Sequence, residues 1–453
     1  MKFQYSEAIR FALIDNLNYL VLVGVLFVQG FFLDPATIGA FYISTLPSFL
    51  LLALITQSLN LTVLRDVSEA KSPSIGKNFA LYVTYFLVLI CILLFNTYLT
   101  NGRQSLIISC CIILHSFFEV NSLIYEANLQ RKGSYVWVPL FRLISTLLSV
   151  LALLVFFFQG LEIMALYFYL VLGALFKYIC HRYRSTEAGG KVNIGLLRSH
   201  LKNHTSYSLL NFAARNVDQY LFSFILGLGA VGVYGRSLQL TQIPIKILNG
   251  LIAGLLQPKS IVNKDYLTRE TLRLHVSALI IISCGFALFF QYILGDILLA
   301  LWGPKWAQVS ESITYLAPAI IVQAVIGYKI SQAVIAGHDN VLVRAGFINL
   351  ITVLPVPVFA ILYGFDEALF AYSCSYAVIA FPMFEIFVSR RVFNESKLLV
   401  FWSICQVSVP IIIVLFGIIC FPQLPFLTLI GWLILLVVPF YRLFGENRNV
   451  VKS

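Results

Sequence analysis

Residues 205–226, TSYSLLNFAARNVDQYLFSFIL, and residues 229–256, GAVGVYGRSLQLTQIPIKILNGLIAGLL, are two long apolar stretches separated only by a Gly-Leu pair. Crossing roughly 30 Å of hydrocarbon as a helix takes about 20 mostly apolar residues, so each stretch is long enough to span a bilayer. The hydrocarbon offers no water to backbone N–H and C=O groups, and such stretches must therefore be helical. The pair predicts an all-α polytopic membrane protein.

Twelve further stretches of the same kind make up most of the 453-residue chain, which is 60% hydrophobic and only 11% charged. Together they predict about 14 transmembrane helices. The expected spans are 11–31, 36–62, 79–99, 105–127, 135–158, 161–181, 205–226, 229–256, 274–295, 307–336, 341–363, 367–389, 398–420 and 424–443.

The Lys and Arg residues are concentrated in every second gap between these spans. Of the 31, 24 fall at the two ends of the chain and in or beside alternate gaps, with Lys177, Arg344 and Arg442 counted with the gap or end next to them, whereas the other gaps hold only Arg103 and Lys305. Cytoplasmic loops are the ones enriched in Lys and Arg, so both termini are expected in the cytoplasm. The net charge of +11 then faces anionic membrane lipid, and we do not expect a nucleic-acid partner. Five basic residues remain inside predicted helices: Arg142, Arg215, Arg236, Lys246 and Lys329.

The first and seventh predicted helices open with a similar polar pattern, which indicates an internal repeat. Residues 15–18, DNLN, correspond to 215–218, RNVD, and residues 36–41, ATIGAF, correspond to 229–234, GAVGVY. Because each copy holds six helices, both enter the membrane in the same direction, as parallel repeats suited to a transporter. The expected division is an N-lobe at 1–182, a basic cytoplasmic linker at 183–204, a C-lobe at 205–391, and a helix pair with a cytoplasmic tail at 392–453.

Charged side chains inside a membrane usually face a partner or a wet cavity, because burying them in hydrocarbon is costly. Arg215 and Asp218 lie three residues apart and so share a helix face. They form either a self-neutralising pair or part of a polar stripe along a cavity. In the second case, Arg215 is available to an anionic head group.

Arg236 and Lys246 are the strongest predicted anion-binding residues, because no acid occurs in the same helix and Pro244 loosens that helix beside Lys246. Snorkelling toward the interface is the alternative for both. Arg142 and Lys329 are weaker candidates for substrate binding and are equally well explained as interfacial anchors.

Three acids inside predicted helices have two interpretations. Asp15, Glu119 and Glu385 either titrate with a coupling ion or neutralise the buried basic residues. The sequence alone leaves both open.

Motifs typical of enzymes are missing from the sequence. It contains no GxSxG, HExxH or Walker A motif, no GxGxxG in a plausible setting, and no long outside loop that could hold a catalytic domain. The eight Cys form no CxxC and no metal-like pairing with His, and we interpret them as packing residues. We therefore expect no catalytic residues, no metal site and no cofactor.

Residues 211–258 carry a family resemblance, in particular RNVDQYL at 215–221, LGLGAVGVYGRSLQL at 226–240, Pro244 and Gln257-Pro258. This segment resembles the central signature of the polysaccharide transporter family, the Wzx-type and colanic-acid-exporter-like flippases of the multidrug/oligosaccharidyl-lipid/polysaccharide exporter superfamily.

The resemblance implies a MATE-like fold of two lobes around a central cavity. It also implies a flippase that moves undecaprenyl-pyrophosphate-linked oligosaccharide units, for O-antigen, capsule or exopolysaccharide, across a bacterial inner membrane. The expected partners are that glycan, anionic inner-membrane lipids and other glycan-assembly membrane proteins. By analogy with the family, the resemblance implies roles in substrate binding for Arg215, Asp218, Arg236 and Lys246.

Two other functions are weighed against this one. A multidrug or lipid II exporter of the same fold fits the topology, but export of cationic drugs predicts an acid-dominated cavity, and the bases at 236 and 246 argue against it. A membrane polymerase or ligase typically needs a large outside loop, and the outside gaps here are short.

Overall fold

The computed structural model describes residues 5–65, 72–73, 90, 104–131, 136–185, 188–190, 194–255, 269–335, 338, 340–393, 395–420 and 425–445. Within these ranges the chain is almost wholly helical, which confirms the all-α class. The described exception is a short parallel pair between β1 (Ser72–Pro73) and β2 (Ala188–Gly190). The helix expected at 79–99 lies outside the described residues, apart from residue 90.

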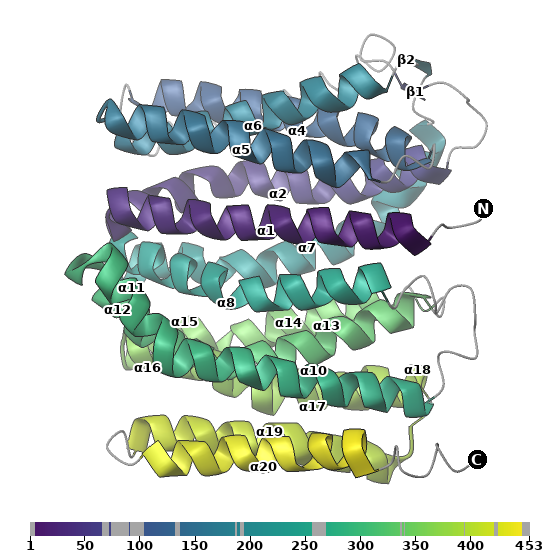
Figure 1. Cartoon of the computed structure of the whole chain (residues 1–453), viewed down its shortest axis with the longest axis vertical. Helices are drawn as coiled ribbons and strands as arrows, with labels where there is room; N and C mark the ends of the chain where they lie inside the picture. Colours follow the sequence, from purple (N-terminus) through teal and green to yellow (C-terminus); the bar gives the residue numbers. More distant parts are fainter. Residues whose placement is uncertain are drawn as a thin grey trace. The chain divides into compact units, whose positions relative to one another are not determined.

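The chain divides into two compact units, and the first consists of Met1–Leu33 and Ala40–Phe212. Within it α6 packs against α4 and α5, and α5 packs against α1, so that their long axes run side by side (Figure 1). Its apolar core includes Leu52, Ile112 and Tyr167. Its helices are α1 (Tyr5–Phe32), most of α2 (Pro35–Arg65), α4 (Gln104–Arg131), α5 (Trp137–Phe158), α6 (Glu162–Arg184) and the first part of α7 (Ile194–Ile225).

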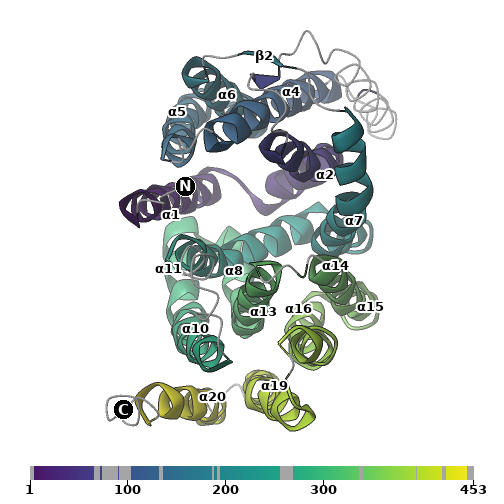
Figure 2. The same ribbon diagram turned by 90° about the vertical axis from the view of Figure 1, so that its right-hand side faces the viewer.

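The second unit consists of Asp34–Gly39 and Ala213–Ser453. Its last two helices form a hairpin, and α20 also packs against α10 (Figure 2). Besides the rest of α7, its helices are α8 (Leu228–Leu255), α10 (Arg269–Phe289), α11 (Gly295–Trp302), α12 (Ala307–Leu316), α13 (Ala319–Ile335), α14 (Asn340–Val353), α15 (Pro355–Leu362), α16 (Phe365–Ser375), α17 (Phe381–Phe384), α18 (Arg390–Val392), α19 (Lys397–Cys420) and α20 (Pro425–Gly445).

Several spans that the hydropathy predicts as single helices are interrupted. The stretch expected at 307–336 is bent by 57° between α12 and α13, next to Pro318. The stretch expected at 367–389 contains two π-helical turns, Tyr376–Ala380 and Glu385–Ser389, on either side of Pro382. Proline has no N–H to donate and its ring clashes with the preceding turn, so the backbone departs from regular α-helix at such positions.

Nine described helices are long and apolar enough to cross a membrane, or ten if the bent pair counts as one span. The chain is therefore a multi-pass membrane protein, while the count of 14 stays a prediction. Helix α7 begins at Ile194, within the stretch 183–204 that the sequence suggested as a linker. Helical structure thus starts earlier there than the hydropathy indicates.

Candidate functional site

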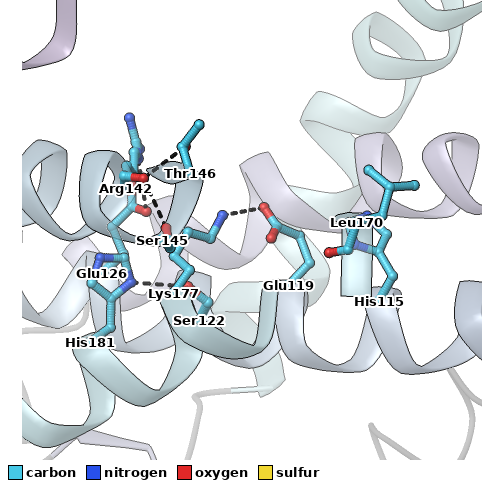
Figure 3. A network of polar contacts seen from close by, with 10 residues as sticks. All are labelled: His115, Glu119, Ser122, Glu126, Arg142, Ser145, Thr146, Leu170, Lys177 and His181. Carbon is cyan, nitrogen blue, oxygen red and sulfur yellow. Dashed lines mark hydrogen bonds and ion pairs between the residues drawn. The ribbon is translucent and has the colours of Figure 1, made fainter. Parts of the chain in front are cut away.

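A partly buried ionic cluster in the first unit is centred on Arg142 of α5 (Figure 3). Its Nη2 donates to Oε1 of Glu126 on α4, and its Nε lies 3.4 Å from the second carboxylate oxygen. Its Nη1 also lies 3.6 Å from Oδ1 of Asp15 on α1. One guanidinium therefore joins three helices and faces two acids. Its planar fork suits bidentate binding of a carboxylate, here that of Glu126.

A second ion pair in the same unit joins Lys177 of α6 to Glu119 of α4 (Figure 3). The charge pattern assigned Lys177 to a cytoplasmic gap, but it lies inside α6. Nearby, Oγ of Ser122 lies 3.0 Å from Nδ1 of His181, and Nδ1 of His115 lies 3.2 Å from the Leu170 carbonyl. These side chains thus bond to groups of neighbouring helices, which takes the place of the water that hydrocarbon does not provide.

Glu126 and Lys177 are the residues of this network that the sequence pattern did not single out as buried charges. A signal for them exists on α4, where His115, Glu119, Ser122 and Glu126 are spaced by four, three and four residues. This spacing places all four on one helix face. A polar stripe on an otherwise apolar helix indicates a face turned toward other helices.

The second unit contains a more deeply buried ion pair. Nζ of Lys329 on α13 lies 2.5 Å from Oε1 of Glu385 and 3.3 Å from Oγ of Ser389. Lys329 also lines a small pocket together with Arg273 and Glu395. The carboxylate of Glu385 therefore neutralises the ammonium of Lys329 inside the protein.

Asp218 of α7 is buried and bonds to Tyr234 rather than to Arg215. The Tyr234 hydroxyl donates to Oδ2, and the backbone N–H of Gln219 donates to Oδ1 at 2.8 Å. The Tyr234 ring contacts that of Tyr372, whose hydroxyl oxygen accepts a bond from Gln323 at 3.1 Å. Of the two interpretations that the sequence left open, the self-neutralising pair does not form, because no ion pair joins Arg215 to Asp218 in the described part of the chain.

The two bases of α8 have different surroundings. Arg236 is only 1% exposed; its guanidinium lies 6.0 Å from the centre of the Trp306 ring and donates to Gln239 at 3.3 Å. Lys246, by contrast, is exposed. Arg236 is therefore held within the packed interior of its unit, and only Lys246 presents its charge to the surroundings.

Arg215 of α7 and Lys246 of α8 form a pair of accessible positive charges. Both side chains are exposed, and they come from consecutive helices. Neither makes an ion pair within the residues that the structure describes. Like charges that approach each other repel, and an anion bound between them relieves that repulsion. We call these two residues the α7–α8 cation pair.

The described residues contain no group of three or more His, Cys, Asp or Glu side chains that could hold a metal ion.

A sequence profile of the family described as "Polysaccharide biosynthesis protein" matches residues 74–311, just over half of the chain. The chain belongs to this family. The match begins before α4 and ends within α12, so it includes both α7 and α8. No curated protein matches the sequence.

Solved structures show which fold this polysaccharide biosynthesis family member adopts. The lipid II flippase MurJ in an inward closed conformation matches with a TM-score of 0.66 over 99% of both chains, at 12% identity. A point mutant of the Vibrio cholerae MATE transporter VcmN matches with a TM-score of 0.60 over 86% of this chain and 98% of its own, at 12% identity.

An outward-facing multidrug resistance MATE transporter of the MOP superfamily also matches, with a TM-score of 0.59 at 12% identity, over 86% of this chain and 96% of its own. These likenesses confirm the MATE-like fold. With the family match they confirm the resemblance to the polysaccharide branch of that superfamily.

Proposed function

We propose that the chain is a flippase for undecaprenyl-pyrophosphate-linked oligosaccharide repeat units, of the O-antigen, capsule or exopolysaccharide kind. It carries them from the cytoplasmic to the periplasmic leaflet of a bacterial inner membrane by alternating access, with both of its termini in the cytoplasm. The membership in a polysaccharide biosynthesis family and the fold shared with the lipid II flippase MurJ support this assignment.

The α7–α8 cation pair is the observation that carries the proposal. A lipid-linked pyrophosphate has a compact, multiply charged head, and Arg and Lys form strong charge-assisted hydrogen bonds to phosphate oxygens. Arg215 and Lys246 come from consecutive helices and are exposed, and we expect them to share one anion. Arg142 and Lys329 are held by acids, which leaves them less suited to capture a substrate.

The acids support a separate role in driving transport. Asp15, Glu119 and Glu385 each face a base of a neighbouring helix. A proton or cation that reaches one of these carboxylates weakens its hold on the base and thereby loosens the contact between two helices. We assign ion coupling to these three residues on that ground.

Export of cationic drugs is the competing function for this fold. It requires an acid whose charge is available to the drug. The acids named above are instead bound to other side chains, namely Arg142, Lys177, Lys329 and Tyr234. The exposed charges of the α7–α8 cation pair are positive instead. These surroundings favour an anionic substrate.

Deletion of the gene tests the function directly. We expect undecaprenyl-linked repeat units to accumulate on the cytoplasmic side and surface glycan to disappear, with both restored by a plasmid copy. Unchanged surface glycan and lipid-linked intermediates, combined with reduced efflux of dyes or drugs, would overturn the proposal in favour of a drug exporter.

A further inference from the structure

The first turns of α2 and α8 are equivalent positions of the internal repeat. A shift of 193 residues, which aligns 36–41 with 229–234, also relates Pro35 to Leu228, the first residues of the two helices. The same shift relates Gly39 to Gly232, each the fifth residue of its helix. Residues 34–39 group with the second unit, so both helix starts belong to one compact body.

The two helix starts touch through their backbones, and the contact is reciprocal. A Cβ on Gly39 would lie 1.9 Å from the carbonyl oxygen of Leu228. A Cβ on Gly232 would lie 1.8 Å from the carbonyl oxygen of Pro35. Each glycine thus covers the first carbonyl of the opposite helix, as a two-fold axis between the repeats requires. A side chain larger than hydrogen fits at neither position.

Some other helical glycines have no such neighbour. Gly24 of α1 and Gly229 of α8 have nothing within 4 Å of a Cβ added to them. Gly229 is only three residues from Gly232. Glycine is therefore required at 39 and 232 by the crossing, not by the helix itself.

We propose that Gly39 and Gly232 form a clasp that holds α2 and α8 together at one end of the helices, and that the clasp parts in each transport cycle. The charge pattern predicts that this end faces the periplasm. The inference rests on the proposed function, because only a transporter that opens at this end needs to separate the two repeats there.

The geometry explains why such a clasp has two states. A contact between backbone atoms cannot adjust by changing side-chain rotamers, so it is either fully made or broken. The chain enters this contact from Leu33 and leaves it at Ala40, and both of these residues group with the first unit. The short segment 34–39 is therefore joined covalently to one unit while it packs as part of the other.

A cysteine pair tests whether the clasp exists and whether it parts. Ala36 and Gly229 are equivalent in the repeat; Ala36 is exposed and Gly229 has open space, so Ala36→Cys and Gly229→Cys are tolerated positions. In a background with its native cysteines replaced, we expect a short, cleavable bifunctional maleimide to link the pair in membranes. Linking should stop export of the glycan, and cleaving the linker should restore it.

The glycines themselves are tested in the same cysteine background. We expect Gly39→Ala and Gly232→Ala each to lower the crosslinking yield several-fold, while Gly24→Ala leaves it unchanged. Because one separation of the helices relieves both clashes, the double variant should lose little more than either single variant. If each substitution damages only its own surroundings, the two losses of crosslinking yield should multiply in the double variant.

Three results overturn the clasp, and the first two do not depend on knowing the substrate. They are absence of crosslinking in the cysteine pair, equal yields in the glycine variants and the Gly24→Ala control, and undiminished export by fully crosslinked protein. A different pair of results would separate the clasp from the proposed substrate. If Gly39→Ala lowers crosslinking but deletion of the gene leaves lipid-linked glycans unaffected, the clasp is retained and the proposed substrate is refuted.

Discussion

Lys329 and Glu385 meet at 2.5 Å with their side chains 4% and 0% exposed. The two residues are 56 positions apart and lie on α13 and on the π-helical turn Glu385–Ser389. A buried pair of this kind holds two helices in one arrangement, but its net stabilisation is small because both charges were removed from water. Its importance appears when one partner is taken away.

Replacing one member of this pair is expected to be far more damaging than replacing both. Lys329→Met leaves an unpaired buried carboxylate and should cost about 3–5 kcal/mol of stability, whereas Lys329→Met with Glu385→Met should be close to neutral. Thermal unfolding of the purified protein in detergent measures both. A double variant as unstable as the single one would show that the ion pair is not what holds these helices.

The Arg142 cluster predicts an unequal response of its two acids. Glu126 accepts two bonds from the guanidinium, whereas Asp15 lies 3.6 Å from it. Glu126→Gln should therefore reduce stability more than Asp15→Asn, and Arg142→Lys should resemble Glu126→Gln because an ammonium cannot form the bidentate pair. The order of the melting temperatures checks this. Equal effects of the two acid substitutions would contradict the geometry.

Asp218 depends on the hydroxyl of Tyr234. Tyr234→Phe keeps the ring packing but removes the bond to Oδ2, and leaving a buried acceptor unsatisfied costs about 1–3 kcal/mol. Tyr220, on α7, is only half-buried and serves as the control, since Tyr220→Phe should change stability little. Thermal unfolding of the two variants, compared with the wild type, decides the matter.

The fold could be predicted from the sequence because membrane spans are specified by composition alone. Apolar stretches of about 20 residues and the alternation of charge need no knowledge of neighbours. The interruptions of these helices could not be placed so well. A proline such as Pro382 either kinks a helix or is accommodated within it, depending on the groups that surround it.

The charged residues inside the helices can be identified from the sequence, but their partners cannot. Arg142 and Lys329 are visible as bases inside predicted helices, yet nothing in a single sequence reveals that helix packing brings Glu126 and Glu385 to them. Arg236 and Lys246 show the same limit, because burial of one and exposure of the other follow from helix packing. Only the polar stripe on α4 indicates in the sequence which helix face turns toward such partners.

Substrate capture by the α7–α8 cation pair yields the prediction that bears most on function. Arg215→Ala and Lys246→Ala should each abolish most surface glycan in a deletion strain while the protein reaches the membrane at its normal level. Arg215→Lys should retain more activity than Arg215→Ala, because a charge near the phosphates remains even though the bidentate fork is lost. Arg390→Ala removes another exposed base, at the start of α18, and should leave glycan unchanged.

In the proposed function the two charges act on one anion, so the losses of activity in their variants should not add. If Arg215 and Lys246 bind the same pyrophosphate, the double alanine variant should export little less than the weaker single variant, whereas two separate sites predict multiplied losses. Lys246→Glu should be worse than Lys246→Ala, because it places a negative charge beside the head group and pairs with Arg215 instead. Quantified surface glycan at matched protein levels measures all four variants. Wild-type glycan in Lys246→Glu would exclude this pair from the substrate path.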